Sequence, residues 1–202
     1  MGDKQRAESY FLKAIELSKT KQLTNVELYA YANLSSMYLD LSQWQKAYDF
    51  AMKAESLGGK MGDLGIQAAS FSKAALAKAN LNEAGDALLL AQRAIALADT
   101  VDQPMITNQA YSSMGFVLKS QKKWKEAIPF YEKGLASLID ADLFIEENGK
   151  LFKEMSECYE QTGNMAKSLE MYKQYSFITD SVRNKDNIQK ATELTMNFEF
   201  EK

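Results

Sequence analysis

Small residues recur along this chain about every 40 positions, and aromatic residues recur with the same spacing. The small residues are Ala7, Ala47, Ala87, Ala127 and Ser168, and the aromatic residues 16 positions before the last four are Tyr31, Phe71, Tyr111 and Phe152. A fixed period in this range is typical of one supersecondary unit stacked on copies of itself. The pattern therefore predicts a repeat protein.

Each unit contains two stretches with the periodicity of an α-helix. Tyr111 is followed at i+3, i+4 and i+7 by Met114, Gly115 and Leu118, which is one face of a helix. The equivalent residues in the other units are Leu34, Ser35, Tyr38, Ala74, Ala75, Lys78, Met155, Ser156 and Tyr159. We call this helix A, and we call the following helix, which carries the recurring small residue, helix B. Small residues on both helices predict a close approach of A to B.

Capping and turn residues predict where these helices begin and end. The predicted starts are the capping boxes Thr24-x-x-Glu27 and Ser42-x-x-Gln45, and then Asp63, Asp102 with Pro104, Trp124 and Asp142. Gly58 and Gly59 predict the end of one B helix near Leu57, because glycine readily adopts the left-handed conformation of a helix stop. Gly163 predicts a second stop.

The two-helix unit resembles the tetratricopeptide repeat (TPR), whose pattern is W-x₂-L-G-x₂-Y, then A-x₃-F, then P. The best copy is Tyr111-x₂-Met114-Gly115-x₂-Leu118 with Ala127-x₃-Tyr131. Five copies in phase make the resemblance specific, and they cover nearly the whole chain.

The chain departs from the TPR pattern at several positions. Lys78 stands where an aromatic residue is expected, Tyr175 replaces a small residue, and the terminal proline is missing throughout. The period is longer than the standard 34 residues, and we expect the added residues between one B helix and the next A helix.

The resemblance implies an all-α fold, a right-handed superhelix (α-solenoid) of two-helix TPR-like repeats followed by a C-terminal helix. We predict that residues 1–179 form the repeat array, with a half repeat at 3–19 and full repeats starting near 28, 68, 108 and 149. Residues 180–202 are predicted to form a capping or linker helix. Because the first B helix has no A partner, we expect the chain to be a piece of a longer protein.

In the TPR family the A helices line a concave face, which implies a protein or peptide as the partner. The corresponding residues here are Tyr29, Asn33, Ser36, Asp40, Lys73, Leu76, Asn80, Gln109, Ser113, Phe116, Lys150 and Lys153. Asparagine and glutamine can hold an extended peptide backbone by paired donor and acceptor groups. A merely solvated inner face is the alternative, since polar residues are the default on any surface.

One TPR subgroup binds chaperone C-termini through a clamp of lysine and asparagine residues. Asn33 and Lys73 match two of the clamp positions, but Ala69 stands where a third position needs lysine. The alternative register places Ala32 and Ser36 where lysine and asparagine are required. The sequence therefore does not predict this activity.

Composition narrows the classes of function. The net charge of −3 and the isoelectric point near 5.2 argue against a nucleic-acid-binding surface. No stretch approaches the roughly 20 apolar residues of a membrane span, and no signal peptide is visible.

Candidate chemistry is sparse. The absence of histidine excludes Ser–His and Cys–His pairs and histidine metal sites from this chain. Cys158 is the single cysteine and is expected to be a packing residue. Asp140 and Asp142 begin an EF-hand-like spacing, but Phe144 and Ile145 occupy positions that require a ligand and a glycine. We predict no enzymatic activity, no cofactor and no metal.

The end of the chain resembles the end of the repeat array in certain bacterial signalling proteins. The residues that carry this resemblance are 175–181 and 191–202. It implies a sensor domain that precedes a membrane helix and a histidine kinase or helix-turn-helix regulator, in which case it would be periplasmic. A cytoplasmic peptide-responsive regulator and a plain assembly scaffold are the alternatives.

The last segment has two conflicting patterns. Ile188, Ala191, Leu194 and Phe198 fall on one helical face, whereas the alternation of residues 194–201 is typical of a strand. A lone strand would leave its backbone edge unpaired, so we predict a helix at least from Ser181 to Leu194. Its apolar face is expected to cover the last B helix. Met196 and Phe200 do not fit that face and point instead to a homodimer contact or to the continuation of the protein.

Overall fold

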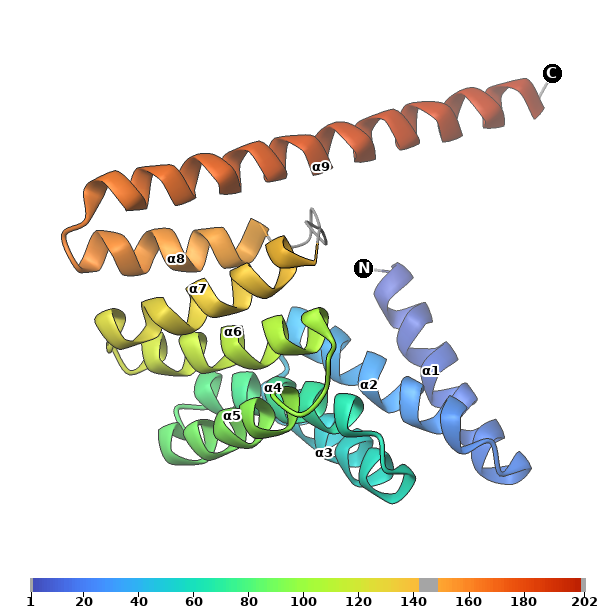
Figure 1. The fold of residues 1–202 in the computed structure, drawn as a ribbon. Coiled ribbons are helices and arrows are strands. Elements are labelled where there is room, and N and C mark those ends of the chain that lie inside the picture. Colours follow the sequence, from blue (N-terminus) through green and yellow to red (C-terminus); the bar gives the residue numbers. More distant parts are fainter. Residues whose placement is uncertain (1, 142–148, 201–202) are drawn as a thin grey trace. The chain divides into compact units, whose positions relative to one another are not determined.

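The protein is described by a computed structural model that covers residues 2–141 and 149–200, and these residues form helices and no strand. The helices are α1 (Gly2–Lys21), α2 (Thr24–Asp40), α3 (Trp44–Met61), α4 (Leu64–Asn80), α5 (Ala84–Ala98), α6 (Pro104–Ser120), α7 (Trp124–Asp140), α8 (Gly149–Gln161) and α9 (Met165–Phe200) (Figure 1). They belong to two compact units, Met1–Ala141 and Asp142–Lys202, which we call the N-terminal and C-terminal units. The predicted all-α repeat fold is confirmed.

Helices in the N-terminal unit begin at strictly regular intervals. The first residues of α2 to α7 are Thr24, Trp44, Leu64, Ala84, Pro104 and Trp124, which are 20 residues apart. The connection between α3 and α4 consists only of Gly62 and Asp63. The expectation of added residues between helices was therefore wrong at this connection, whereas residues 99–103 do separate α5 from α6.

Several predicted helix ends were also wrong. The N-caps of α2 and α3 are Leu23 and Gln43, and neither makes a side-chain capping hydrogen bond. The residues just before them, Gln22 and Ser42, have φ values of 56°, so a left-handed turn sets where each helix starts. Thr24 therefore lies inside its helix and Ser42 lies outside, and neither capping box forms.

The helix end predicted at Gly58 was wrong, and the helix cap predicted at Asp63 was confirmed. Gly58 lies inside α3, which continues to Met61 and ends at Gly62 with a φ of 71°. Asp63 does cap α4, because its Oδ1 accepts a hydrogen bond of 2.9 Å from the Ile66 N–H.

The remaining helix-end predictions concern three later positions. The N-cap of α6 is Gln103 and not Asp102, with Pro104 in the first turn as predicted. Gly163 follows α8 with a φ of 81°, as expected for a stop. Asp142 lies outside the described residues.

The A helices of the N-terminal unit form an inner layer. Helix α4 contacts both α2 and α6, whereas the B helices α3, α5 and α7 contact A helices and not one another. Helices on the inner side of a curved stack approach one another, and those on the outer side diverge. This arrangement indicates that α2, α4 and α6 face the concave side of this unit.

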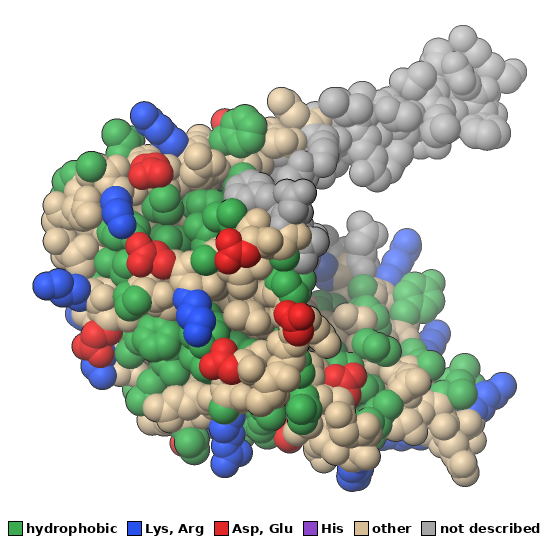
Figure 2. Space-filling view, in the orientation of Figure 1, with side chains coloured by type: hydrophobic (Ala, Val, Ile, Leu, Met, Phe, Trp, Pro, Cys, Tyr) green, Lys and Arg blue, Asp and Glu red, His purple; other side chains and the backbone are tan. Residues whose placement is uncertain are grey.

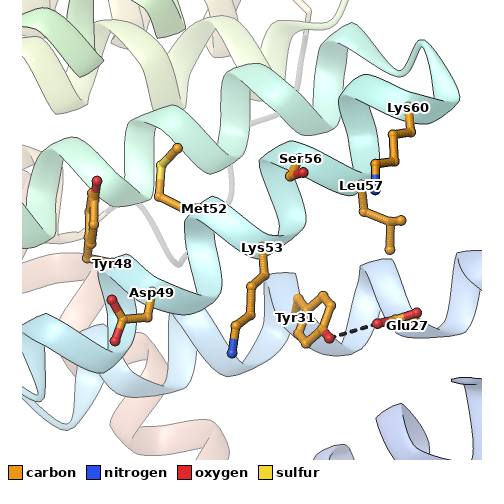
Figure 3. A pocket seen from close by; sticks show the side chains of 9 residues that line it. All are labelled: Glu27, Tyr31, Tyr48, Asp49, Met52, Lys53, Ser56, Leu57 and Lys60. Carbon is orange, nitrogen blue, oxygen red and sulfur yellow. Dashed lines mark hydrogen bonds between the residues drawn. The ribbon is translucent and has the colours of Figure 1, made fainter.

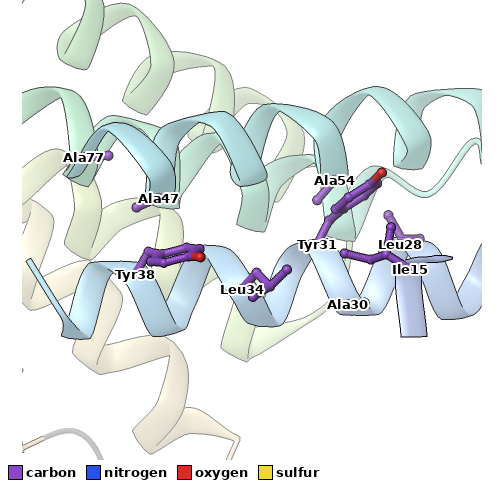
Figure 4. Close-up of a cluster of buried hydrophobic side chains, with 9 residues drawn as sticks. All are labelled: Ile15, Leu28, Ala30, Tyr31, Leu34, Tyr38, Ala47, Ala54 and Ala77. Carbon is purple, nitrogen blue, oxygen red and sulfur yellow. The ribbon is translucent and has the colours of Figure 1, made fainter. Parts of the chain in front are cut away.

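The core of the N-terminal unit is built from small residues packed against aromatic ones. One cluster joins α1, α2, α3 and α4 through Ile15, Leu28, Ala30, Tyr31, Leu34, Tyr38, Ala47, Ala54 and Ala77 (Figure 4). The recurring alanines Ala47, Ala87 and Ala127 are all completely buried, which confirms the repeat phase taken from the sequence. A hydrogen bond of 2.9 Å from the Ser35 Oγ to the Ala47 carbonyl shows how closely α2 approaches α3.

Cation–aromatic pairs follow the same repeat. The side chains of Lys53, Arg93 and Lys133 lie over the rings of Tyr31, Phe71 and Tyr111, and in each pair the cation follows the aromatic residue by 22 positions. Lys78, which departs from the TPR pattern, lies 4.4 Å from the ring centroid of Tyr48. Its Nζ also bonds Glu83 at 2.5 Å, so this lysine joins α4 to α3 and to the start of α5.

The C-terminal unit pairs α8 with α9. The Ser156 Oγ donates to the Ser168 carbonyl at 2.9 Å, which repeats the A–B contact of Ser35 with Ala47. Helix α9 is a single helix of 36 residues, so the helical prediction for the last segment is confirmed as far as Phe200. The segment continues the last B helix without a break at residue 180, so it cannot fold back to cover that helix as a cap would.

Candidate partner-binding surface

The residues predicted to bind a partner differ in their exposure. On α2, Asn33 and Asp40 are exposed, and the Tyr29 side chain is 58% exposed despite its large apolar ring. Leu76 and Phe116, on α4 and α6, are half-buried and could serve as apolar anchors. Together these residues give the A-helix layer a polar surface with scattered aromatic and aliphatic groups.

Lys73 is the most unusual of these residues. Its Nζ donates a hydrogen bond of 3.0 Å to the Ala32 carbonyl, which joins α4 to α2. Among the side chains that the structure describes, no Asp or Glu forms an ion pair with it. Burial lowers the pKa of Lys73 to about 8, because removal from water disfavours the charged ammonium. The A-helix layer therefore holds a cation without a matching carboxylate.

Other predicted polar residues are engaged within their own helices. Ser36 and Asn80 donate to the carbonyls of Ala32 and Leu76 at 3.2 and 2.8 Å. Ser113 is only 1% exposed and donates to the Ala110 carbonyl at 2.8 Å, so its side chain cannot contact a partner in this conformation. The Gln109 Oε1 is buried without a hydrogen-bond partner among the described residues.

Lys150 and Lys153 belong to the other unit. Both lie on α8 and are exposed. They share α8 with the buried residues Phe152 and Met155, so this helix presents cations on one side while its apolar side packs inward.

An open groove formed by α2 and α3 includes none of the predicted partner-binding residues and was not predicted from the sequence. It has a volume of about 650 Å³ and is lined by Glu27, Tyr31, Tyr48, Asp49, Met52, Lys53, Ser56, Leu57 and Lys60 of α2 and α3 (Figure 3). The Tyr31 hydroxyl donates to the Glu27 Oε1 at 2.7 Å. Burial and this bond raise the pKa of Tyr31. The repeat pattern assigned Tyr31 to the core, and nothing in the sequence indicated that one side of its ring lines a groove.

The visible surface carries charges of both signs. Figure 2 shows acidic and basic side chains interspersed, with neither sign forming a continuous block on that face. Within the described part of the chain, no group of three or more His, Cys, Asp or Glu residues could hold a metal ion. No helix there is long and apolar enough to cross a membrane.

This architecture is a TPR-like helical repeat, and solved structures share it. The chain is similar to BtubC (BKLC) from P. vanneervenii, with a TM-score of 0.67 and 18% identity over 90% of this chain and 75% of the other. It is also similar to a putative kinesin light chain with nearly identical TPR-like repeats from Podosopora anserina, with a TM-score of 0.58 and 18% identity over 91% and 90%.

A third similar structure is a Rap protein complexed with competence and sporulation factor. Its TM-score is 0.66 with 13% identity, and the match covers 89% of this chain but only 56% of the Rap chain. No family model matches the sequence, and no curated protein matches it. The comparisons therefore support the predicted TPR-like fold through structure, at sequence identities that show the fold alone.

Proposed function

We propose that this chain is a non-catalytic protein-binding module that uses the A-helix layer of its N-terminal unit to hold an extended peptide segment. The observation that carries this proposal is the packing of α2, α4 and α6 side by side while the B helices diverge. Stacked helical repeats with this geometry present an extended concave surface for a partner.

The side chains of this layer suit a peptide. Asn33 is exposed and offers both a donor and an acceptor to a peptide backbone. Lys73 supplies a positive charge that no carboxylate of the described chain neutralises, so a partner with an acidic group would compensate it. Phe116 is half-buried and provides an apolar contact further along the layer. The sensor domain of a larger bacterial signalling protein is the biological role that we favour, and a cytoplasmic regulator or scaffold is the alternative.

A peptide-display selection on the wild-type protein tests the proposal. Selected peptides should bind the wild type, and the double variant Asn33→Ala/Lys73→Ala should lose most of that binding. The matched control is Gln92→Ala/Lys125→Ala, which removes an amide and an ammonium from exposed positions on the B helices α5 and α7. Equal binding by both double variants would place the site elsewhere and refute the role of this layer.

A further inference from the structure

The groove between α2 and α3, which we call the α2–α3 groove, follows one side of α3 for most of its length. The α3 residues that line it run from Tyr48 to Lys60, and α2 supplies the opposite wall with Glu27 and Tyr31 (Figure 3). At a rise of 1.5 Å per residue, the distance along α3 from Tyr48 to Lys60 is about 18 Å. The volume of about 650 Å³ lies within the range of roughly 300–1,000 Å³ that is typical of ligand sites. The groove can therefore hold a short segment of another molecule.

Both carboxylates of the α2–α3 groove have partners within this chain. The Glu27 Oε1 accepts a hydrogen bond of 2.7 Å from the Tyr31 hydroxyl and lies 3.9 Å from the Lys19 Nζ. The Asp49 Oδ1 accepts a hydrogen bond of 2.9 Å from the Gln45 Nε2. These contacts satisfy part of the hydrogen-bonding capacity of each carboxylate without any ligand.

The two lysines of the groove are in a different situation. Lys53 and Lys60 are exposed, and within the described part of the chain neither ammonium forms an ion pair. The Lys53 Nζ lies 4.7 Å from the ring centroid of Phe50 and 5.8 Å from that of Tyr31. Figure 3 shows this side chain extending from α3 toward the Tyr31 ring on α2. The rings attract the ammonium through their faces, which leaves its N–H groups able to donate to a ligand.

The spacing of the two lysines defines the ligand that they can bind together. Lys53 precedes Lys60 by seven residues, which is close to two helical turns and about 10.5 Å along α3. A peptide in the polyproline II conformation advances about 3.1 Å per residue with three residues per turn, so its side chains i and i+3 lie on one side about 9.3 Å apart. Six residues of such a peptide cover about 19 Å, which matches the length of the groove.

Apolar side chains of α3 lie close to the two lysines. Leu57 comes between them in the sequence and Met52 precedes Lys53, and both side chains are half-buried in the groove. Methionine is flexible and adapts to ligands of different shape. An apolar residue between the two carboxylates of a peptide would therefore find a contact here.

We propose that the α2–α3 groove is a second binding site of this chain, which binds an extended acidic peptide segment through Lys53 and Lys60. The two ammonium groups would pair with carboxylates on residues i and i+3 of the segment, while Met52 and Leu57 contact the side chains between them. This inference is independent of the function proposed for the A-helix layer, because the two sites share no residue.

Charge complementarity favours an acidic segment over a basic one. An acidic segment meets two ammonium groups that have no ion pair to break. A basic segment would compete with the Tyr31 hydroxyl and Lys19 for Glu27, and with Gln45 for Asp49. The segment should bind weakly, since exposed ion pairs each contribute little to affinity in water.

A chemical-shift titration of the isotope-labelled full chain with unlabelled peptides tests this inference. The probe is acetyl-Gly-Glu-Leu-Ala-Glu-Gly-amide, whose blocked ends leave the two glutamates as its only charges. It should shift the backbone amides of Lys53 and Lys60 in the millimolar range. The peptide with glutamine in place of both glutamates should bind about tenfold more weakly, because both ion pairs would be lost.

Charge reversal provides the second arm of the test. Lys53→Glu/Lys60→Glu should lose the acidic probe and prefer the peptide with lysine in place of both glutamates. The matched control is Arg93→Glu/Lys125→Glu, which makes the same change in net charge at exposed positions outside the groove. It also removes one cation from an aromatic ring, because Arg93 lies over Phe71.

Two further variants keep the test decisive. Lys53→Gln/Lys60→Gln removes both charges without introducing new ones, and circular dichroism shows whether each variant is folded. Asn33→Ala/Lys73→Ala should still bind the acidic probe, so the groove and the A-helix layer can fail separately.

Four results would overturn the inference. Absence of shifts in the groove, or equal affinity for the glutamate and glutamine peptides, would show that the two lysines do not recognise carboxylates. Tighter binding of the lysine peptide by the wild type would assign the groove to a basic partner. Equal loss of the probe in Arg93→Glu/Lys125→Glu would show a general attraction to a positive surface.

Discussion

Gly115→Ala provides a sharp test of the packing between α6 and α7. A Cβ added to Gly115 would lie 2.8, 2.8 and 2.9 Å from the Cδ1, Cε1 and Cγ of the Tyr131 ring. Carbon atoms pack best at about 3.5–4.0 Å, so the ring would have to move by several tenths of an ångström. Tyr131 is only 1% exposed, and the space around its ring is filled. The new methyl group should therefore strain this contact.

The expected magnitude follows from two opposing terms. Overpacking a well-packed core typically costs about 1–3 kcal/mol. Replacing glycine by alanine within a helix gains about 0.5–1 kcal/mol, because alanine loses less backbone entropy on folding. We therefore expect Gly115→Ala to lower the free energy of unfolding by about 0.5–2 kcal/mol. Gly85→Ala in α5 should raise it by up to about 1 kcal/mol, since a Cβ there meets no atom within 4 Å.

Urea unfolding followed by circular dichroism measures both changes. The Tyr131→Leu background gives a further check, because removing the ring should abolish the cost of Gly115→Ala or turn it into a gain. The coupling free energy between the two positions should then be of order 0.5–3 kcal/mol, as for other residues in direct contact. If Gly115→Ala stabilises the wild type as much as Gly85→Ala does, the close contact between Gly115 and Tyr131 does not exist.

Two further predictions concern the buried alanine and the buried lysine. Ala127→Leu adds three carbons at a fully buried position on α7 and should cost about 1–3 kcal/mol; an unchanged melting temperature would contradict the repeat phase. Lys73→Met should stabilise the protein at pH 7 by at most about 3 kcal/mol, because the pKa of Lys73 is lowered from 10.5 to about 8 and each unit corresponds to about 1.4 kcal/mol. Between pH 8 and 10.5 Lys73 is protonated in the unfolded chain and largely neutral in the folded one. The free energy of unfolding of the wild type should therefore rise with pH across this range relative to that of Lys73→Met. Parallel pH profiles for the two proteins would refute the burial of this charge.

The repeat phase could be predicted from the sequence because it depends on residue size at fixed spacing. Ala47, Ala87 and Ala127 are small because a second helix lies against each of them, and no larger side chain would fit. The cap at Asp63 was also predictable, since it needs only a carboxylate three residues before an amide. The capping boxes at Thr24 and Ser42 failed because the left-handed residues Gln22 and Ser42 set the helix starts, which moves the N-cap one position earlier in α2 and one position later in α3.

The candidate binding surface could be predicted only in part from the sequence. Helical periodicity placed Asn33, Lys73 and Ser113 at equivalent positions of successive A helices, yet one is exposed, one is half-buried and one is buried. Side-chain length contributes to the difference, because the short Ser113 hydroxyl bonds the Ala110 carbonyl of its own helix, whereas the long Lys73 side chain reaches the Ala32 carbonyl on α2. The groove around Tyr31 and Lys53 could not be predicted at all, because it depends on how α2 and α3 lie against each other.

The sequence by itself determined the type and phase of the helices in the repeats, because these depend on local periodicity and on small residues at contact positions. The tertiary structure decided which of the repeat's surfaces remain open. The same face of a B helix is covered on α3 and exposed on α9, although both carry apolar or aromatic residues at the equivalent positions Tyr48 and Leu169. Among the described residues, a neighbouring helix covers this face on α3 and none covers it on α9, and local sequence carries no information about that neighbour.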